Sequence, residues 1–336
     1  MIFHTLIAYQ INDSLDILRL LGSVLVIVIM LVAIYYFTLF LNNSSEKTFN
    51  TTVIVILYLL LLISFSGVVL SYVPFAQYKE LNTPIFPFAE PSHYSLIAAP
   101  FYLWVTIKQT KTIYKLLLIM GGLILLIYIS NLTLVIVILL NCFLAFDFKK
   151  IMLIIPVGII FASMLTFDAT YYVKRVDIED NNLSTLVWLQ GWEEAYLDIK
   201  RTSGFGIGFQ QFGVKEPEGE SASAIFFLTK VYLNRYDGGT FGSKLIGELG
   251  IFGFIILIII LMKIYRSLLF LKRISISNTV STHLVFYHCC VSYFILEIFV
   301  RSMSFIAPGF FMFMVGIIGS DFSKIKKELD FIHRPQ

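Results

Sequence analysis

The chain is poor in charged residues and in cysteine, and several metal-binding motifs are missing from it. Only 14% of its 336 residues are charged, whereas soluble proteins average about a quarter. The three cysteines, Cys142, Cys289 and Cys290, all lie in apolar stretches, so no disulfide framework is expected. No H-E-x-x-H, no paired C-x-x-C and no D-x-D occurs, so we expect no metal site. Residues 1–10 lack a basic segment and a cleavage site, so we expect no removable signal peptide.

Apolar residues dominate instead, because 58% of the chain is hydrophobic. Apolar runs of about 17 to 25 residues, enough to cross about 30 Å of hydrocarbon, recur along it. Such runs must be helices, since unpaired backbone groups are not tolerated in lipid. The sequence therefore predicts an all-α polytopic membrane protein with about nine transmembrane helices. The expected spans are approximately 16–41, 52–73, 92–107, 113–129, 132–147, 151–168, 244–262, 284–300 and 303–320.

The distribution of lysine and arginine between these spans predicts the orientation of the chain. Basic residues are concentrated in alternate connections and in the carboxy-terminal tail, and the positive-inside rule assigns that side to the cytoplasm. We therefore expect three parts. Residues 1–168 form the N-terminal transmembrane helices, residues 169–243 an extracytoplasmic loop with an amphipathic helix, and residues 244–336 the C-terminal transmembrane helices and a cytoplasmic tail.

The long loop contains one predicted amphipathic helix. Asn182 or Ser184 can cap its start, and Gly204 can end it. Trp188 and Trp192 lie one turn apart on its apolar face. An anchor at the membrane interface is the favoured interpretation of these tryptophans, and stacking on a sugar ring is the alternative.

Glycines follow this helix at positions 204, 206 and 208. Their spacing lacks the third glycine of a dinucleotide-binding fingerprint, and the loop is expected to face away from cytoplasmic nucleotides. We therefore interpret them as residues that let the backbone turn tightly above the membrane.

Ionisable residues beside apolar sequence need an explanation, because a charge at the centre of a membrane helix costs roughly 2.5 to 3.5 kcal/mol. On the outer side these residues are Glu90, His93, Arg175, Arg201, Arg235, Asp237, Glu248, Glu297 and Arg301. Non-functional interpretations exist for several of them. Glu297 can pair with Arg301 on one helical face, and Arg235 can pair with Asp237. Glu90 can cap the helix that begins at the following proline.

Two further residues of this set also have simple interpretations. Arg175 can be solvated or contact lipid headgroups, and His93 can be a polar residue at the interface. The functional alternative is phosphate binding, because the planar fork of arginine holds two phosphate oxygens at once. Arg301, at the outer end of its helix, is the clearest candidate for that task.

Five short segments are notable for their order along the chain. They are Glu90-Pro91-Ser92-His93, Gly191-Trp192-Glu193, Gly204-Phe-Gly206-Ile-Gly208, Leu233-Asn-Arg235-Tyr-Asp237-Gly238-Gly239 and Gly247-Glu248-Leu-Gly250-Ile-Phe-Gly253. From about Glu90 to Arg301, this order resembles the Wzy-type O-antigen polymerases. The resemblance implies a GT-C-like glycosyltransferase of the bacterial inner membrane. Such an enzyme moves a growing glycan from one undecaprenyl pyrophosphate onto another lipid-linked repeat unit, without metal, nucleotide or other cofactor.

The resemblance also implies roles for individual residues. The implied substrate-binding residues are Arg175, Arg301, Arg235, His93, Trp192 and Glu248. A carboxylate takes the proton of the acceptor hydroxyl, and Asp237 is the first choice because a helix dipole lowers the basicity of Glu90, the second choice. The expected partners are undecaprenyl-pyrophosphate-linked oligosaccharides, the lipid bilayer and a polysaccharide chain-length regulator, with no nucleic acid.

Three other functions are alternatives to polymerisation. The related O-antigen ligases typically carry a histidine near the region of residues 230–240, whereas this chain has Asp237 there and no histidine between His93 and His283. A lipid-linked oligosaccharide flippase should show internal helix repeats and charges from both leaflets, and neither is found. A purely structural membrane subunit is the third alternative.

Overall fold

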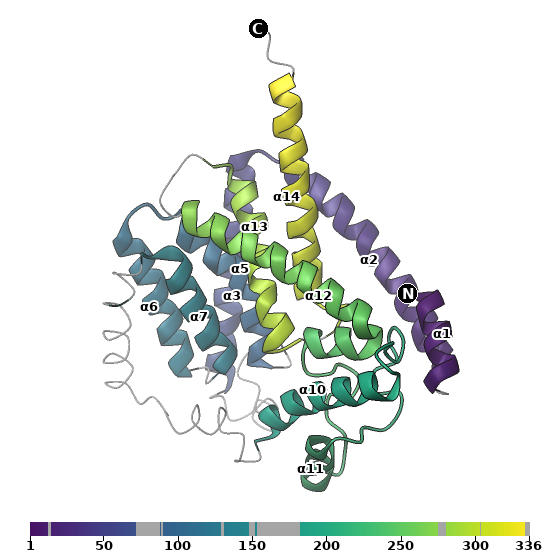
Figure 1. Ribbon diagram of the computed structural model, residues 1–336. Helices are drawn as coiled ribbons and strands as arrows, with labels where there is room; N and C mark the ends of the chain where they lie inside the picture. Colours follow the sequence, from purple (N-terminus) through teal and green to yellow (C-terminus); the bar gives the residue numbers. More distant parts are fainter. Residues whose placement is uncertain are drawn as a thin grey trace. The chain divides into compact units, whose positions relative to one another are not determined.

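The computed structural model describes part of the chain. The described residues are 1–12, 15–71, 88, 90–128, 131–147, 152, 182–274, 280–302 and 304–332. Within them the regular secondary structure is helical throughout (Figure 1). The helices are α1 (Ile2–Asn12), α2 (Ile17–Asn43), α3 (Glu46–Ser71), α5 (Pro91–Lys108), α6 (Thr112–Tyr128), α7 (Leu132–Ala145), α10 (Leu183–Arg201), α11 (Glu220–Thr229), α12 (Phe241–Ile274), α13 (Thr282–Phe299) and α14 (Pro308–Ile332).

Four of the helices are long and apolar enough to cross a membrane. They are α2, residues 46–66 of α3, α12 and α13, and α1, α6, α7 and α14 contain shorter apolar segments. In the apolar windows of α2 and α3 only 17% and 28% of the residues are buried, so most of their apolar side chains face outward. An apolar helix with an exposed apolar surface is suited to lipid. The chain is therefore an α-helical membrane protein.

Most of the expected spans coincide with helices. The stretch 113–147, too long for one crossing, forms the two helices α6 and α7. Asn131 ends the break between them, because its side-chain oxygen accepts from the backbone N–H of Leu134 at 3.1 Å and caps α7. The expected span at 151–168 lies outside the described residues. Helix α1 was not expected, because its eleven residues are too few for a crossing.

The contacts divide the chain into two units. Unit 1 comprises Met1–Ile34, Thr170–Tyr265 and Phe294–Phe311, and unit 2 comprises Tyr35–Ala169, Arg266–Tyr293 and Met312–Gln336. Each unit collects segments that are far apart in the sequence.

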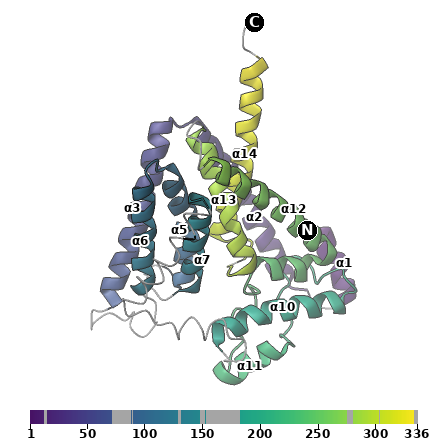
Figure 2. The same ribbon diagram turned by 60° about the vertical axis from the view of Figure 1, so that its left-hand side comes forward.

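In unit 2, α5 packs against α3 and α7, and α6 packs against α7 (Figure 2). Helix α5 contains few residues that face outward, and Trp104 is among its fully enclosed side chains. The helices approach closely at Gly122, where an added Cβ would lie 2.6 Å from the hydroxyl of Tyr102. Small residues at such contacts are common between membrane helices, because they allow close backbone approach.

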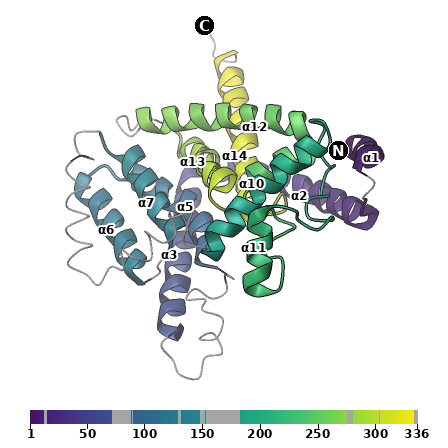
Figure 3. The same ribbon diagram turned by 60° about the horizontal axis from the view of Figure 1, so that its bottom comes forward.

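In unit 1, α10 and α11 lie side by side (Figure 3). The start of α10 is capped by Asn182, whose side-chain oxygen accepts from the N–H of Ser184 at 3.0 Å, as the sequence predicts. The start of α11 is held by Glu193 of α10, which accepts from the N–H and the hydroxyl of Ser221 at 2.9 and 2.8 Å. The contact between the two helices therefore rests on side chains of α10 as well as on apolar packing.

The first turns of α12 are joined to the glycine-containing turn that follows α10. At Gly250 the helix is interrupted by a left-handed residue with φ of 58° and ψ of −130°. Backbone groups at this kink pair with the turn, because Gly204 O accepts from Ile251 N at 2.9 Å and Glu248 O accepts from Gly208 N at 2.9 Å. A Cβ at Gly250 would lie 2.1 Å from Gly204 O. The expectation that these glycines form a tight turn is confirmed.

Candidate functional site

The apolar face of α10 packs within unit 1. The indole N–H of Trp188 donates to the carbonyl oxygen of Phe299 at 2.7 Å. The ring of Trp192 stacks on the ring of Phe299, with centroids 6.4 Å apart and planes 14° apart. Its edge also lies against Gly242 of α12, where an added Cβ would be 3.1 Å away. Trp192 thus serves as a packing residue on these two sides, and its predicted contact with a sugar remains a prediction.

A buried ion pair on α12 contacts two loops of unit 1. Lys244 and Glu248, one turn apart on α12, are 1% and 0% exposed, and their Nζ and Oε1 atoms are 3.7 Å apart. The carboxylate of Glu248 accepts from the N–H groups of Gln210 and Phe212 at 2.7 and 3.2 Å, and Lys244 donates to the carbonyl of Tyr236 at 2.6 Å. The ion pair therefore attaches the loops that contain residues 210–212 and Tyr236 to α12.

The loop 233–240 presents Tyr236 together with two arginines. The guanidinium carbons of Arg19 and Arg235 lie 4.5 and 4.8 Å from the centre of the Tyr236 ring, which is 47% exposed. A cation over an aromatic face is attracted by the ring quadrupole. We refer to Arg19, Tyr236 and Arg235 as the arginine platform.

Both guanidinium groups of the arginine platform are held by backbone carbonyls. Arg19 donates to Phe212 O at 2.9 Å and to Tyr236 O at 3.2 Å. Arg235 donates to Gly213 O at 2.8 Å and to Val214 O at 3.3 Å. A guanidinium has five N–H donors. Within the described part of the chain these bonds use two donors of each arginine, so the groups are oriented by the fold and have further donors that can bind an anion.

Arg301 lies at the same loop. With the Asn234 amide oriented so that its oxygen faces the guanidinium, this oxygen accepts from both Nη atoms of Arg301 at 2.9 and 3.2 Å. The backbone also joins the two segments, because Ser302 N donates to Gly239 O at 3.1 Å. Glu297 interacts with the side chain of Ser302 instead. The expected Glu297–Arg301 pair is therefore replaced by a contact between Arg301 and the loop.

Asp237 lies within this group of positive charges. Its backbone N–H donates to the carbonyl of Asn234 at 3.1 Å, which forms a turn before two glycines. Its carboxylate is close enough to Arg19 and Lys244 to interact electrostatically with both. Arg235, the partner considered from the sequence, directs its guanidinium to the carbonyls named above. The structure thus brings Asp237, Arg235 and Arg301 together and adds Arg19 to them.

Two other predicted site residues belong to unit 2. Glu90 is the N-cap residue of α5, and its backbone carbonyl accepts from His93 N at 3.1 Å. Its carboxylate accepts from the hydroxyl of Ser92 at 2.9 Å rather than from a helix N–H. The position is therefore the expected one, but the capping is incomplete. Arg175 lies outside the described residues.

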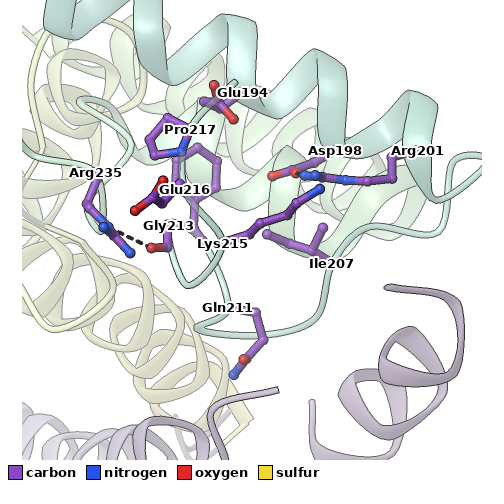
Figure 4. Close-up of a pocket in the computed structure, with 11 residues that line it drawn as sticks. Glu194, Asp198, Arg201, Ile207, Gln211, Gly213, Lys215, Glu216, Pro217 and Arg235 are labelled. Carbon is purple, nitrogen blue, oxygen red and sulfur yellow. Dashed lines mark hydrogen bonds and ion pairs between the residues drawn. The ribbon is translucent and has the colours of Figure 1, made fainter. Parts of the chain in front are cut away.

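A pocket opens between α10 and the loop that follows its glycine turn (Figure 4). Three acidic side chains, Glu194, Asp198 and Glu216, and three basic ones, Arg201, Lys215 and Arg235, line it. In Figure 4 the side chains of Asp198 and Arg201 lie next to each other on the α10 side, and Arg235 lies on the opposite side, where it bonds to Gly213.

Charges of the pocket are paired within unit 1. Arg201 forms an ion pair with Asp198, three residues before it, and lies 3.4 Å from an oxygen of Glu218. The same Glu218 oxygen lies 2.6 Å from Lys215 Nζ. Asp198 is 3% exposed. Burial raises its pKa to about 7, although the positive charge of Arg201 acts in the opposite direction.

Glu194 has a different environment from Asp198. Its Oε1 atom accepts from the backbone N–H groups of Glu218 and Gly219, both at 2.7 Å. Burial nevertheless raises the pKa of this carboxyl above its ordinary value. Glu194 thus holds residues 218 and 219 at the end of the loop after α10, whereas the carboxyl of Asp198 is ion-paired with Arg201.

Sequence reasoning did not select Arg19, Tyr236 or the pocket. The one available signal for Arg19 was its position as a lone arginine at the predicted outer end of an apolar span. Comparison with protein-family models, with curated proteins and with solved structures found no match to this chain.

Proposed function

We propose that the chain is a polysaccharide polymerase of the bacterial inner membrane, a metal-independent glycosyltransferase of the Wzy type. It joins undecaprenyl-pyrophosphate-linked oligosaccharide repeat units at the extracytoplasmic face of that membrane, and its nine crossings are arranged in a GT-C-like fold. The observation that supports this proposal best is the convergence of Arg19, Arg235 and Arg301 on the loop 233–240 of an apolar helical protein.

Three arginines in this position suit a lipid-linked pyrophosphate. The ligand carries its negative charge close to the membrane surface, and arginine can bind two phosphate oxygens with a planar fork. Arg19 belongs to α2, one of the helices suited to cross the membrane. Because Arg19 and Arg235 are oriented by backbone carbonyls, they need little reorganisation when charge develops on the leaving group. Arg175 is proposed as a further pyrophosphate ligand on the basis of its sequence position.

The reaction requires a leaving group and a base. The acceptor hydroxyl oxygen forms a bond to the anomeric carbon of the donor sugar, and the bond from that carbon to the pyrophosphate oxygen breaks. The bonding electrons leave with undecaprenyl pyrophosphate, whose charge the arginines stabilise. The hydroxyl proton passes to a carboxylate, with Asp237 as the first choice and Glu90 as the second. His93 and Trp192 remain proposed substrate contacts.

The position of Asp237 is compatible with this role. Its carboxylate interacts electrostatically with the neighbouring Arg19 and Lys244, and a carboxylate is a suitable group to accept a hydroxyl proton. It precedes two glycines with φ of 65° and 66°, which set the shape of the loop. Lys244, paired with the buried Glu248, donates to the carbonyl of Tyr236 in the loop 233–240. This contact would keep the base in position during turnover.

An O-antigen ligase would use the same donor and leaving group but a different acceptor. The absence of a histidine between His93 and His283, noted above, favours the polymerase. A flippase would move the lipid-linked unit without making a bond. These alternatives predict different products from the same lipid substrate, so one experiment separates them.

The test is incubation of the purified full chain, in lipid vesicles, with an undecaprenyl-pyrophosphate-linked repeat unit. A polymerase yields a ladder of products that differ by one repeat unit on a gel. A ligase yields single transfer only when its lipid acceptor is added, and a flippase yields transport with an unchanged substrate. A ladder supports the proposal, and either of the other two results contradicts it.

A further inference from the structure

Helix α1 has the polarity of a helix in an apolar surrounding. Its polar residue Thr5 is fully buried, and its polar residue His4 is partly buried. Its large apolar residues Phe3 and Leu6 are 77% and 49% exposed. In a water-soluble protein a surface helix buries its apolar side and exposes its polar side. The order is reversed in α1, which fits a helix whose outer face contacts lipid.

The inner face of α1 contacts the glycine-containing turn that follows α10. The hydroxyl oxygen of Thr5 accepts from the buried N–H of Phe209 at 2.8 Å. The Nε2 atom of His4 lies 3.0 Å from the carbonyl oxygen of Phe205, and the His4 ring stacks on the Phe205 ring with centroids 4.5 Å apart. A Cβ at Gly208 would lie 2.7 Å from Cγ2 of Thr5. These contacts determine which face of α1 is turned outward.

Apolar side chains are also exposed on α2, next to α1. Figure 1 shows α1 beside the first turns of α2, and both belong to unit 1. Leu18 and Leu25 of α2 are 85% and 61% exposed, and such side chains of a membrane helix face lipid. The eleven residues of α1 extend only about 16 Å and cannot cross about 30 Å of hydrocarbon. An orientation in the plane of the membrane, at the end of α2, suits a helix of this length.

The absence of charge on α1 narrows the kind of partner. The helix contains no Asp, Glu, Lys or Arg, and burial lowers the pKa of His4 from its ordinary value, so the imidazole is neutral near pH 7. Binding must therefore come from burial of apolar side chains, and not from attraction to charged headgroups. A second copy of the chain could also cover these side chains. Lipid is the better partner, because the exposed apolar surface continues on the membrane helix α2.

We propose that α1 is an in-plane membrane anchor. Phe3 and Leu6 are buried in the apolar edge of the bilayer, and His4 and Thr5 attach the glycine-containing turn to the anchor. The turn continues into residues 210–212, which bond to Glu248 and Arg19. The anchor thus holds the loops of the arginine platform at the level of the lipid headgroups. It does not depend on the polymerase function, because it follows from the polarity and contacts of α1.

The location of α1 is tested with single cysteines in the full chain, after the three native cysteines are replaced by alanine. The chain is placed in vesicles of phosphatidylethanolamine and phosphatidylglycerol, and a fluorophore is attached to Phe3→Cys or, as a second position, to Leu6→Cys. Leu25→Cys on α2 is the lipid-facing reference. Glu220→Cys, at an exposed acid of α11, is the water-facing reference.

Two quenchers then report the surroundings of each fluorophore. Positions 3 and 6 should be quenched by nitroxides on the lipid chains, as position 25 is, and about tenfold less than position 220 by iodide in water. Iodide quenching as strong as at position 220 would overturn the proposal. Protection from both quenchers that is lost when the protein is diluted in lipid would show that a second copy covers α1, and this result would also overturn the proposal.

Hydrogen–deuterium exchange of residues 205–212 in the same vesicles tests the attachment of the turn. Thr5→Val keeps the shape of the side chain and removes the acceptor of the Phe209 N–H, so exchange should rise about tenfold. Thr5→Ser keeps the hydroxyl and is the matched control. Phe3→Ser weakens the contact with lipid and should raise exchange severalfold. Phe227→Ser, at an equally exposed phenylalanine of α11, should not, and equal exchange in these last two variants would contradict the anchor.

The anchor and the polymerase function can fail separately. Lipid quenching at position 3, in a chain that makes no glycan ladder, would support the anchor and reject the polymerase. A ladder from a chain whose position 3 is open to iodide would support the polymerase and reject the anchor.

Discussion

The helix bundle of unit 2 and the loop region of unit 1 use polar side chains in opposite ways. In the bundle, Asn141 donates to the hydroxyl of Tyr293, and the indole N–H of Trp104 donates to a backbone carbonyl. In unit 1, Arg19 and Arg235 also donate to carbonyls, but each commits only two of its five donors there. The bundle uses its polar groups to join helices, whereas unit 1 orients charged groups and keeps part of their binding capacity. This difference indicates where a ligand is expected.

The largest effect should be the loss of stability on removing Glu248, whose carboxylate attaches the loops of unit 1 to α12. Glu248→Ala leaves Lys244 as a buried charge and leaves the N–H groups of Gln210 and Phe212 without their acceptor. Breaking a buried pair in this way costs about 3 to 5 kcal/mol. We expect the variant to be nearly absent from membranes, or to melt far below the unchanged chain in detergent. The control Glu220→Gln should melt normally, and a normal Glu248→Ala melting curve would refute the supporting role.

Activity should respond next most strongly to the arginines of the loop region. Arg19→Lys and Arg301→Lys keep the positive charge but lose the planar fork. We expect each to lower the polymerisation rate about a hundredfold, because leaving-group stabilisation is lost, while the amount of folded protein stays the same. Arg266→Lys, an exposed arginine of unit 2, is the matched control. Full-length ladders from both loop variants would show that these arginines do not bind the leaving group.

Removal of the proposed base should lower turnover by a comparable or somewhat smaller factor. Asp237→Asn keeps the shape of the side chain and removes the proton acceptor, so turnover should fall about a hundredfold with lipid-substrate binding retained. Glu90→Gln is the comparison in unit 2, and we expect it to be nearly normal. The reverse pattern would transfer the role to Glu90. Normal activity in both variants would mean that stabilisation of the leaving group alone drives the transfer.

Within a single pH unit, the smallest effect is a pH-dependent change in stability at Asp198. Its ordinary pKa of 3.8 is raised to about 7 in the fold. Between these values the folded protein binds more protons than the unfolded chain, so its stability falls as the pH rises, by at most about 1.4 kcal/mol per pH unit. Asp198→Asn removes this pH-dependent loss of stability, because asparagine does not titrate.

The melting temperature of the chain in detergent measures this effect. Between pH 5 and pH 8 the melting temperature of Asp198→Asn should rise relative to that of the unchanged chain. This difference in melting temperature should level off above the raised pKa. Glu220→Gln should show no such trend. A difference between Asp198→Asn and the unchanged chain that is constant with pH would mean that Asp198 does not titrate in this range.

The sequence predicted the helices well, because long apolar runs leave few alternatives in a membrane. It also predicted a cap at Asn182 or Ser184, of which the structure uses Asn182, and the tight turn at Gly204 to Gly208, since these depend on local residue types. The enclosed position of Glu248 was not predicted. Its partners are backbone N–H groups 36 and 38 residues away, and such groups leave no pattern in the side chains.

The same limit applies to the candidate site. Arg19 bonds to carbonyls 193 and 217 residues away, so the sequence could not show these partners, and its position at the end of an apolar span was the one signal for it. The pocket depends on how α10 meets the loop after it, which composition cannot give. The residues Arg235, Asp237 and Arg301 were selected from sequence, because charges beside apolar runs are costly and require a partner.

The most direct test of the account is to measure the undecaprenyl pyrophosphate released when the purified chain acts on a lipid-linked repeat unit. Mass spectrometry can count released carrier and new glycosidic bonds in the same reaction. We expect one carrier to be released for each repeat unit joined, and almost none to be released by Arg301→Lys. Bond formation without carrier release, or undiminished release from that variant, would contradict it.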